Sequence, residues 1–227
     1  MHRLKILVLA IMAALSVGAL VAATASAVEP AGFLPGAEEI TYTGTSGPGT
    51  LTALGGTKVE CESDTSSGSF AANQKLGRFH IDFKGCTSLN QPCTGLGEAS
   101  GVILVLGEAH LVVDVDSPSL GAGILFLVET VHFMCSIILV KVSGALVCLI
   151  TPLTKTNKFK IVCEETTLGS GIAKEKKYWN EAGTEVTLEH EGANPGLLTF
   201  VNEGAGKGSA ENTTAEITTN KEITIDA

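Results

Sequence analysis

Apolar and polar residues alternate along several short segments of the chain, which is the pattern of β-strands that bury one face. In residues 79–84, FHIDFK, the side chains of Phe79, Ile81 and Phe83 fall on one face and the polar side chains on the other. The same alternation occurs in TKVECE (57–62), HLVVDVD (110–116), TEVTLEHE (184–191) and KEITIDA (221–227).

Stretches rich in Gly, Ser and Pro lie between these segments and predict turns. They are GTSGPGT (44–50), DTSSGS (64–69), SPSLGAG (117–123), NPG (194–196) and EGAGKGS (203–209). Many short strands and few helical periods predict an all-β fold, an antiparallel β-sandwich or barrel. Only GIAKEKKYWNEA, residues 171–182, could form a helix, so we expect at most one short helix.

The most apolar stretch beyond the N-terminus is FMCSIILVKVSGALVC, residues 133–148. One interpretation is a membrane helix from Gly121 to Val140, with acidic residues before it and lysines after it. That helix would place Glu129 and His132 near the middle of the bilayer, where an acidic group is costly. The many β-branched residues favour strands instead, with a break at Ser143–Gly144. We therefore expect a pair of core strands.

The N-terminal segment has the three parts of a secretory signal peptide. A basic start with Arg3 and Lys5 precedes an apolar run, and small residues follow at 25–27. We expect residues 1–27 to be a signal peptide cleaved after Ala27, with an uncleaved N-terminal anchor as the alternative. The remaining residues 28–227 are predicted to form a single all-β domain of a secreted protein, which meets the membrane only through the signal peptide.

All six cysteines lie after the predicted cleavage site. An even number of cysteines in an exported chain predicts disulfides that staple the domain. The sequence lacks the C-x-x-C or Cys/His spacing of a metal site. A bridge between Cys61 and Cys86 on neighbouring strands is favoured, and the pairing of the other four stays open. Those four are Cys93, Cys135, Cys148 and Cys163.

Charge and motifs exclude several functions. The formal net charge is −9 and no cluster of Lys or Arg is present, so phosphate backbones would be repelled and nucleic acid is not expected as a partner. Residues 204–209, GAGKGS, lack the spacing of a phosphate-binding loop, and the sequence contains no G-x-S-x-G nucleophile motif. We predict no catalytic residue and no cofactor from these motifs.

The best cluster of residues for chemistry is Glu108, His110, Asp114 and Asp116, which share one face of a predicted strand. Carboxylates and an imidazole could bind Ca²⁺ or another metal, or act as an acid/base pair in a secreted hydrolase. The simpler interpretation is a solvated outer face, because outward positions of a strand are ordinarily polar.

Four phrases of the sequence resemble a set of uncharacterised secreted six-cysteine proteins from soil actinobacteria, over roughly Thr57 to Ala227. The phrases are GRFHIDFKGCTS (77–88), PLTKTNKFKIVCEE (152–165), YWNEAGTEV (178–186) and AEITTNKEITIDA (215–227). The resemblance implies bacterial secretion and brings no activity or site residue. We therefore expect a non-catalytic extracellular or cell-envelope module that binds a ligand or has a structural role, with the hydrolase as the alternative.

Overall fold

The computed structural model of the chain describes residues 32–34, 38–53, 56–71, 76–114, 121–164, 177–179, 185–187, 197–202 and 204–226. All regular structure in these residues is β-strand, so the all-β prediction is confirmed. The strands are β1 (Gly32–Leu34), β2 (Ile40–Ser46), β3 (Gly49–Ala53), β4 (Lys58–Cys61), β5 (Ser63–Phe70), β6 (Leu76–Lys84), β7 (Thr87–Ser88), β8 (Gln91–Gly95), β9 (Ile103–Asp114), β10 (Gly121–Cys135), β11 (Ile138–Thr151), β12 (Thr156–Glu164), β13 (Lys177–Trp179), β14 (Glu185–Thr187), β15 (Leu198–Val201) and β16 (Lys207–Asp226). Within the described ranges, no helix has the length and hydropathy needed to span a membrane.

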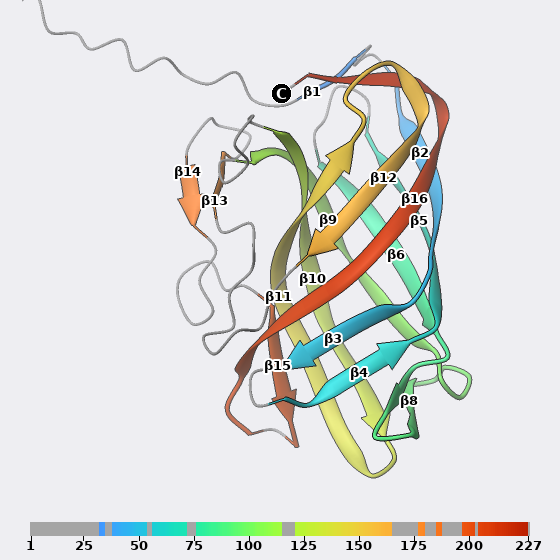
Figure 1. Cartoon of the computed structure of the whole chain (residues 1–227), viewed down its shortest axis with the longest axis vertical. Helices are drawn as coiled ribbons and strands as arrows, with labels where there is room; N and C mark the ends of the chain where they lie inside the picture. The colour runs from blue at the N-terminus through green and yellow to red at the C-terminus, as the bar shows by residue number, and fades with distance from the viewer. Residues whose placement is uncertain are drawn as a thin grey trace, which may run out of the picture.

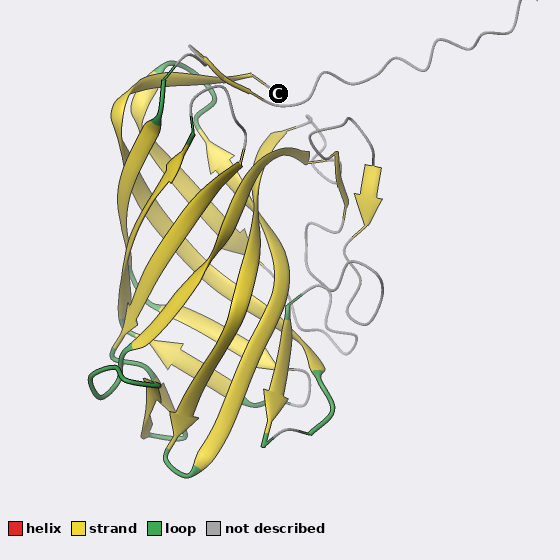
Figure 2. Ribbon diagram, turned by 180° about the vertical axis from the view of Figure 1, so that it is seen from behind, coloured by secondary structure: helices red, strands yellow, loops and turns green. Residues whose placement is uncertain are grey.

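The strands pair antiparallel and close into a barrel, seen from two sides in Figure 1 and Figure 2. Three strands, β10, β11 and β16, run along it without a break. Each of the five other positions in the ring is filled by two strands that follow one another in line, which we call composite strands: β2/β3, β4/β5, β6/β7, β8/β9 and β12/β15. Starting from β16, the order around the ring is β2/β3, β4/β5, β6/β7, β8/β9, β10, β11 and β12/β15. The last of these pairs with β16 and closes the ring.

Two of the predicted turns are mostly strand, and the last three residues of two others, 121–123 and 207–209, also belong to strands. Residues 64–69 lie within β5, and residues 44–50 leave the sheet only at Gly47–Pro48. The register is the same on both sides of that break, with Ser46 opposite Asp64 and Gly49 opposite Cys61. The turn prediction was wrong here because neighbours on both sides supply backbone hydrogen bonds, so these Ser- and Gly-rich residues need no apolar alternation to join the sheet.

The inward faces of the strands form the core in two adjoining clusters. One contains Phe79, Leu111 and Ile217, and the other contains Phe133 and five of the six cysteines as buried residues. The rings of Phe79 and Phe126 meet edge to face, with their centroids 5.1 Å apart. The inward positions predicted for residues 79–84 are confirmed.

The apolar stretch 133–148 is strand, so the membrane-helix interpretation of residues 121–140 is wrong. The break between its two strands is at Ser136–Ile137, where Cys135 pairs with Ile138, and is not at Ser143–Gly144. Ser136 adopts a left-handed φ of 57°, which closes the tight turn. Ser143–Gly144 lies inside β11, where the register shifts by one residue near Val128.

Burial on both faces explains why β10 and β11 are so apolar. Their inward side chains belong to the core, while an outer cluster of Val112, Leu125, Ala145 and Val147 is covered by Val186 from β14. Strands buried on two faces lose the polar half of the alternation.

The strand β13 pairs with both β9 and β14, so the helix prediction is wrong for 177–179; the other residues of 171–182 lie outside the described residues.

All six cysteines are paired, in the bridges Cys61–Cys86, Cys93–Cys135 and Cys148–Cys163. The first is the pair that the sequence favours. Cys93 and Cys135 are direct register partners, and the other two bridges lie one residue beyond the paired residues Glu60–Thr87 and Leu149–Val162. Each bridge therefore joins adjacent strands of the barrel. Three disulfides indicate an oxidising, extracellular environment.

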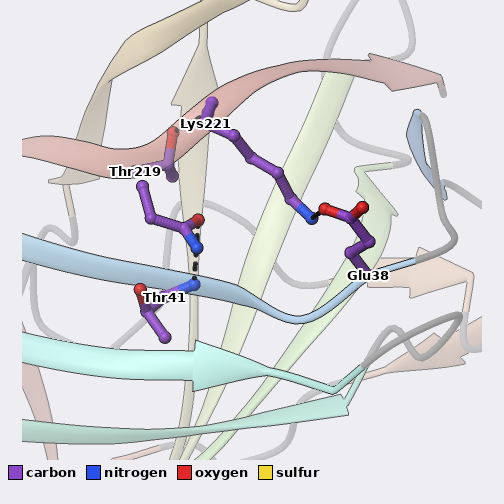
Figure 3. Close-up of polar contacts among 5 residues, drawn as sticks. Glu38, Thr41, Thr219 and Lys221 are labelled. Atoms are coloured by element: carbon purple, nitrogen blue, oxygen red, sulfur yellow. Dashed lines mark hydrogen bonds and ion pairs between the residues drawn. The ribbon is translucent and has the colours of Figure 1, made fainter.

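The seam between β16 and the start of β2 is closed by polar contacts near one end of the barrel. Figure 3 shows Lys221 extending from β16 to Glu38, with Nζ 3.0 Å from a carboxylate oxygen. The amide nitrogen of Thr41 donates to the side-chain oxygen of Asn220 at 3.2 Å. Thr219 turns back to its own strand, where its hydroxyl donates to the Lys221 carbonyl at 2.7 Å. The contacts of Lys221 and Asn220 thus extend the pairing of β16 with β2 towards Glu38.

Glycine is required at Gly107 by a close backbone approach. A Cβ there would lie 2.1 Å from the Leu127 carbonyl oxygen and 2.7 Å from the ring of Phe79. We expect Gly107→Ala to lower the free energy of unfolding by about 1–3 kcal/mol, the usual cost of overpacking. Urea denaturation measures this change. Gly47→Ala is the control, since a Cβ at Gly47 has no neighbour within 4 Å among the described residues; equal losses in the two variants would contradict the prediction.

Candidate functional site

The barrel encloses a cavity of about 120 Å³. Strands from all around the ring contribute to its wall, and most of the lining side chains are apolar. The apolar lining includes Leu51, Val59, Phe79, Ile81, Phe83, Ile103, Val105, Phe126, Val128, Val131, Phe133, Val142, Leu146, Ile161, Leu197 and Ile217. A concave apolar space with a few polar groups is the usual form of a small-molecule site. A closed eight-stranded barrel is wide enough to hold one small ligand.

Polar side chains line only one part of this wall, on β5, β16 and the adjoining end of β2. Asp64 and Ser66 point inward from β5, while Glu211 and Thr213 point inward from β16. They come together because β2/β3 lies between these strands and has small residues at its inward positions there, Gly44 and Gly49 among them. The cavity therefore has one acidic, hydroxyl-bearing side and is otherwise apolar.

Asp64 is a buried carboxyl group, with only 4% of the residue exposed. Its neighbour across the strand pair, Ser46, donates a short hydrogen bond from Oγ to its Oδ2. Burial raises the pKa of Asp64, and the hydrogen bond from Ser46 and the positive charge of Lys84 oppose that rise. The carboxylate is thus retained in the wall by one hydroxyl donor and one nearby cation.

Glu211 lies on β16, opposite Leu51, and lines the same cavity. The residue as a whole is partly exposed. Burial and then the negative charge of Asp64 raise the pKa of Glu211 from 4.5 to about 7. Near neutral pH this carboxyl group can gain or lose a proton in response to what occupies the cavity.

Two hydroxyl groups of the polar wall are buried without a hydrogen-bond partner among the described residues: Ser66 Oγ and Thr213 Oγ1. Both lie against glycines of β2/β3. An added Cβ on Gly44 would be 2.5 Å from Ser66 Oγ, and one on Gly49 would be 3.3 Å from Thr213 Oγ1. An unsatisfied buried hydroxyl costs about 1–3 kcal/mol. A molecule in the cavity is placed to supply the missing bonds.

The predicted cluster of Glu108, His110, Asp114 and Asp116 is only partly described. Glu108 Oε2 and His110 Nε2 are 4.0 Å apart, and Glu108 Oε1 also lies 3.8 Å from a guanidinium nitrogen of Arg78. The side chain of Asp114 and all of Asp116 fall outside the described residues. Among the residues that are described, no three His, Cys, Asp or Glu side chains gather in a way that could hold a metal ion.

The outer surface carries a wider groove of about 540 Å³ along β2, β5, β6 and β9. It is lined by His80 and Arg78, and His80 Nε2 lies 3.1 Å from a carboxylate oxygen of Asp82. Neither Glu108 nor His110 lines this groove. This groove therefore gives no support to the hydrolase that the predicted acidic face suggested.

The polar residues of the cavity wall are ones that the sequence patterns did not single out. Asp64 and Ser66 lie in the stretch 64–69 that was predicted to be a turn. The inward position of Glu211 could have been predicted from the sequence. Alternate residues of a strand share a face, so Glu211 lies on the same face as the inward residues Ala215 and Ile217. A carboxyl group at an inward position is the kind of exception that marks a site.

Comparison with protein-family models, with curated proteins and with solved structures finds no match for this chain.

Proposed function

We propose that this protein is an exported, disulfide-stapled binding module that holds a small, largely apolar ligand inside its barrel. The observation that carries this proposal is the interior cavity, whose wall is apolar except for one polar side. Apolar surface gives affinity through its removal from water, and the few polar groups give orientation. Export through a signal peptide cleaved after Ala27, and a location outside the cell or in its envelope, are parts of the same proposal, supported by the three disulfides.

The volume of the cavity limits the ligand. A dry, apolar cavity of about 150 Å³ binds benzene, so a cavity of about 120 Å³ suits a single six-membered ring or a branched alkyl group of similar size. Benzyl alcohol is a suitable neutral probe, because it has such a ring and a hydroxyl group that can reach the polar side of the wall.

Filling the cavity should abolish binding of this probe. Val105 points into the cavity from β9, so Val105→Phe should weaken the binding of benzyl alcohol by about tenfold or more, a loss of about 1.4 kcal/mol. An NMR titration of the full exported chain measures the dissociation constant. Thermal unfolding of the same variant checks that it is folded.

The matched control is Leu106→Phe, one residue along the same strand. Leu106 is 38% exposed and lies on the outer surface, so this variant should bind benzyl alcohol as the wild type does. If Val105→Phe is folded and binds the probe as tightly as the control, or if the wild type does not bind it at all, the proposed function is wrong.

A further inference from the structure

We infer that one end of the barrel docks on the surface of a lipid membrane and inserts two apolar side chains between the lipids. The side chains are Leu89, in the turn between β7 and β8, and Ile137, in the turn between β10 and β11; we call them the apolar tips. Each residue is 88% exposed, more than any other large apolar residue among those described. Single exposed apolar side chains are common on proteins. These two differ in their position, their backbone and their surroundings.

The apolar tips lie on neighbouring turns at the same end of the barrel, the lower end in Figure 1. The strands β8 and β10 pair with Cys93 opposite Cys135, and the turns Leu89–Asn90 and Ser136–Ile137 lie just beyond this pair. The two turns are also in contact, because the amide nitrogen of Ser136 donates to the Pro92 carbonyl at 3.4 Å. Both tips can therefore reach one flat surface at the same time.

The turn at Leu89 has a backbone conformation that is unfavourable for leucine. Leu89 and Asn90 have φ values of 51° and 61°. Two successive positive φ values are typical of a type I′ hairpin turn, where asparagine and glycine are the usual residues. The leucine thus has a strained backbone although its side chain lies almost entirely in water. Conformations of this kind are typically retained at sites that serve a function.

Two disulfides hold the apolar tips in place. Cys86, bridged to Cys61, precedes Leu89 by three residues, and the Cys93–Cys135 bridge joins the two strands that carry the turns. A side chain on a turn that is already ordered loses less conformational freedom when it binds. The bridges therefore favour binding through the tips.

The sequence around both tips is free of charge. Residues 85–97 and 133–140 contain no Asp, Glu, Lys or Arg, although these residue types make up 17% of the chain. A charged side chain next to a tip would resist transfer out of water, whereas short uncharged polar side chains resist it much less. The net charge of −9 would oppose an anionic surface. The surface that suits this end is therefore a neutral, zwitterionic lipid.

A membrane fits the tips better than a protein partner does. A stable protein interface buries more than about 1,000 Å² in total, and two side chains on separate turns supply only a small part of that area. A fluid bilayer accepts separate side chains without a matching pocket and removes them from water. The cavity extends to this end, because Phe133, two residues before Cys135, lines it. The chain would then meet a membrane here as well as through its predicted signal peptide.

The test is co-sedimentation of the full exported chain with sucrose-loaded phosphatidylcholine vesicles. The double variant Leu89→Asn/Ile137→Asn should lower the partition coefficient by about tenfold or more, because two apolar side chains no longer leave the water. The net charge does not change. Asparagine tolerates a positive φ better than leucine does, so the variant should melt at the wild-type temperature or above it. Thermal unfolding without vesicles checks this.

The matched control is Leu106→Asn/Leu127→Asn, which removes two exposed leucines from the side of the barrel and should keep the wild-type partition coefficient. Docking through the tips is wrong if the wild type stays in the supernatant, or if the tip variant sediments with the vesicles as the wild type does. It is also wrong if the wild type is a dimer without vesicles and the tip variant a monomer, since the tips would then join two copies. Binding of benzyl alcohol should be the same in the tip variant and the wild type, so the proposed function is tested separately.

Discussion

Reduction of the three disulfides should unfold the protein at 25 °C. The bridges close segments with sequence separations of 25, 42 and 15 residues. Each bridge in that range contributes about 2–4 kcal/mol, mainly by restricting the unfolded chain. Their sum is comparable with the whole stability of an ordinary domain, about 5–15 kcal/mol. Near-UV circular dichroism and thermal melting, recorded with and without a reducing agent, should show loss of the cooperative transition.

A single bridge gives a graded version of the same experiment. Replacing Cys148 and Cys163 together by serine should lower the free energy of unfolding by about 3 kcal/mol and leave a folded protein, because two bridges remain. The oxidised wild type treated with the same buffer is the control for the reduction. A reduced protein that melts at the same temperature as the oxidised one would show that the sheet needs no disulfides.

Glu211→Gln should stabilise the protein at pH 8 by on the order of 2–3 kcal/mol and have little effect at pH 5. The pKa of Glu211 is raised in the folded state, from 4.5 to about 7. The folded state therefore binds more protons than the unfolded state between these two values, and stability falls as the pH rises through that window. One pKa unit corresponds to 1.36 kcal/mol. The neutral amide of glutamine has no such dependence.

Urea denaturation at pH 5, 6, 7 and 8 measures this effect on the ligand-free protein. The wild-type curve should fall between pH 5 and 7 and then level off, while the Glu211→Gln curve should be flatter. Glu216→Gln serves as the matched control on the same strand, because Glu216 is exposed on the outer face. Parallel wild-type and Glu211→Gln curves over the four pH values would mean that the Glu211 carboxyl is not buried at the cavity.

The fold class could be predicted because one-sided strands have a visible period. Residues 79–84 and the end of β16 alternate in the sequence and in the structure alike. The break between β10 and β11 could not be predicted, because Ser136–Ile137 has no glycine and its left-handed φ falls on a serine. The composite strands could not be predicted from the sequence either. The break between β2 and β3 resembles a turn in sequence, and only pairing with both neighbours shows that the two strands lie in line.

The candidate site was missed for a related reason. Its polar residues occupy inward positions, whereas the predicted cluster lies at outward positions such as Glu108 and His110. Period-two counting assigns a face only when apolar residues mark it, and β5 has one large apolar side chain, Phe70, at its far end. The disposition of Asp64 and Ser66 thus depends on the register of β5 against β2, a property of paired strands that no single segment encodes.

The strand β16 lies outside the part of the chain that the disulfides cross-link, so the molecule could be cut into two pieces before it. All three bridges lie between Cys61 and Cys163, so apart from the chain connection that precedes it, the 20-residue strand β16 is held in the barrel by hydrogen bonds and packing. A cut in the connection at Gly204–Gly206 would release a peptide that carries Glu211 and leave a cross-linked fragment that carries Asp64. Because both pieces line the cavity, a ligand that contacts both of them would strengthen their reassociation. The fold therefore contains the elements of a two-fragment reporter, in which capture of a peptide would signal that the cavity is occupied.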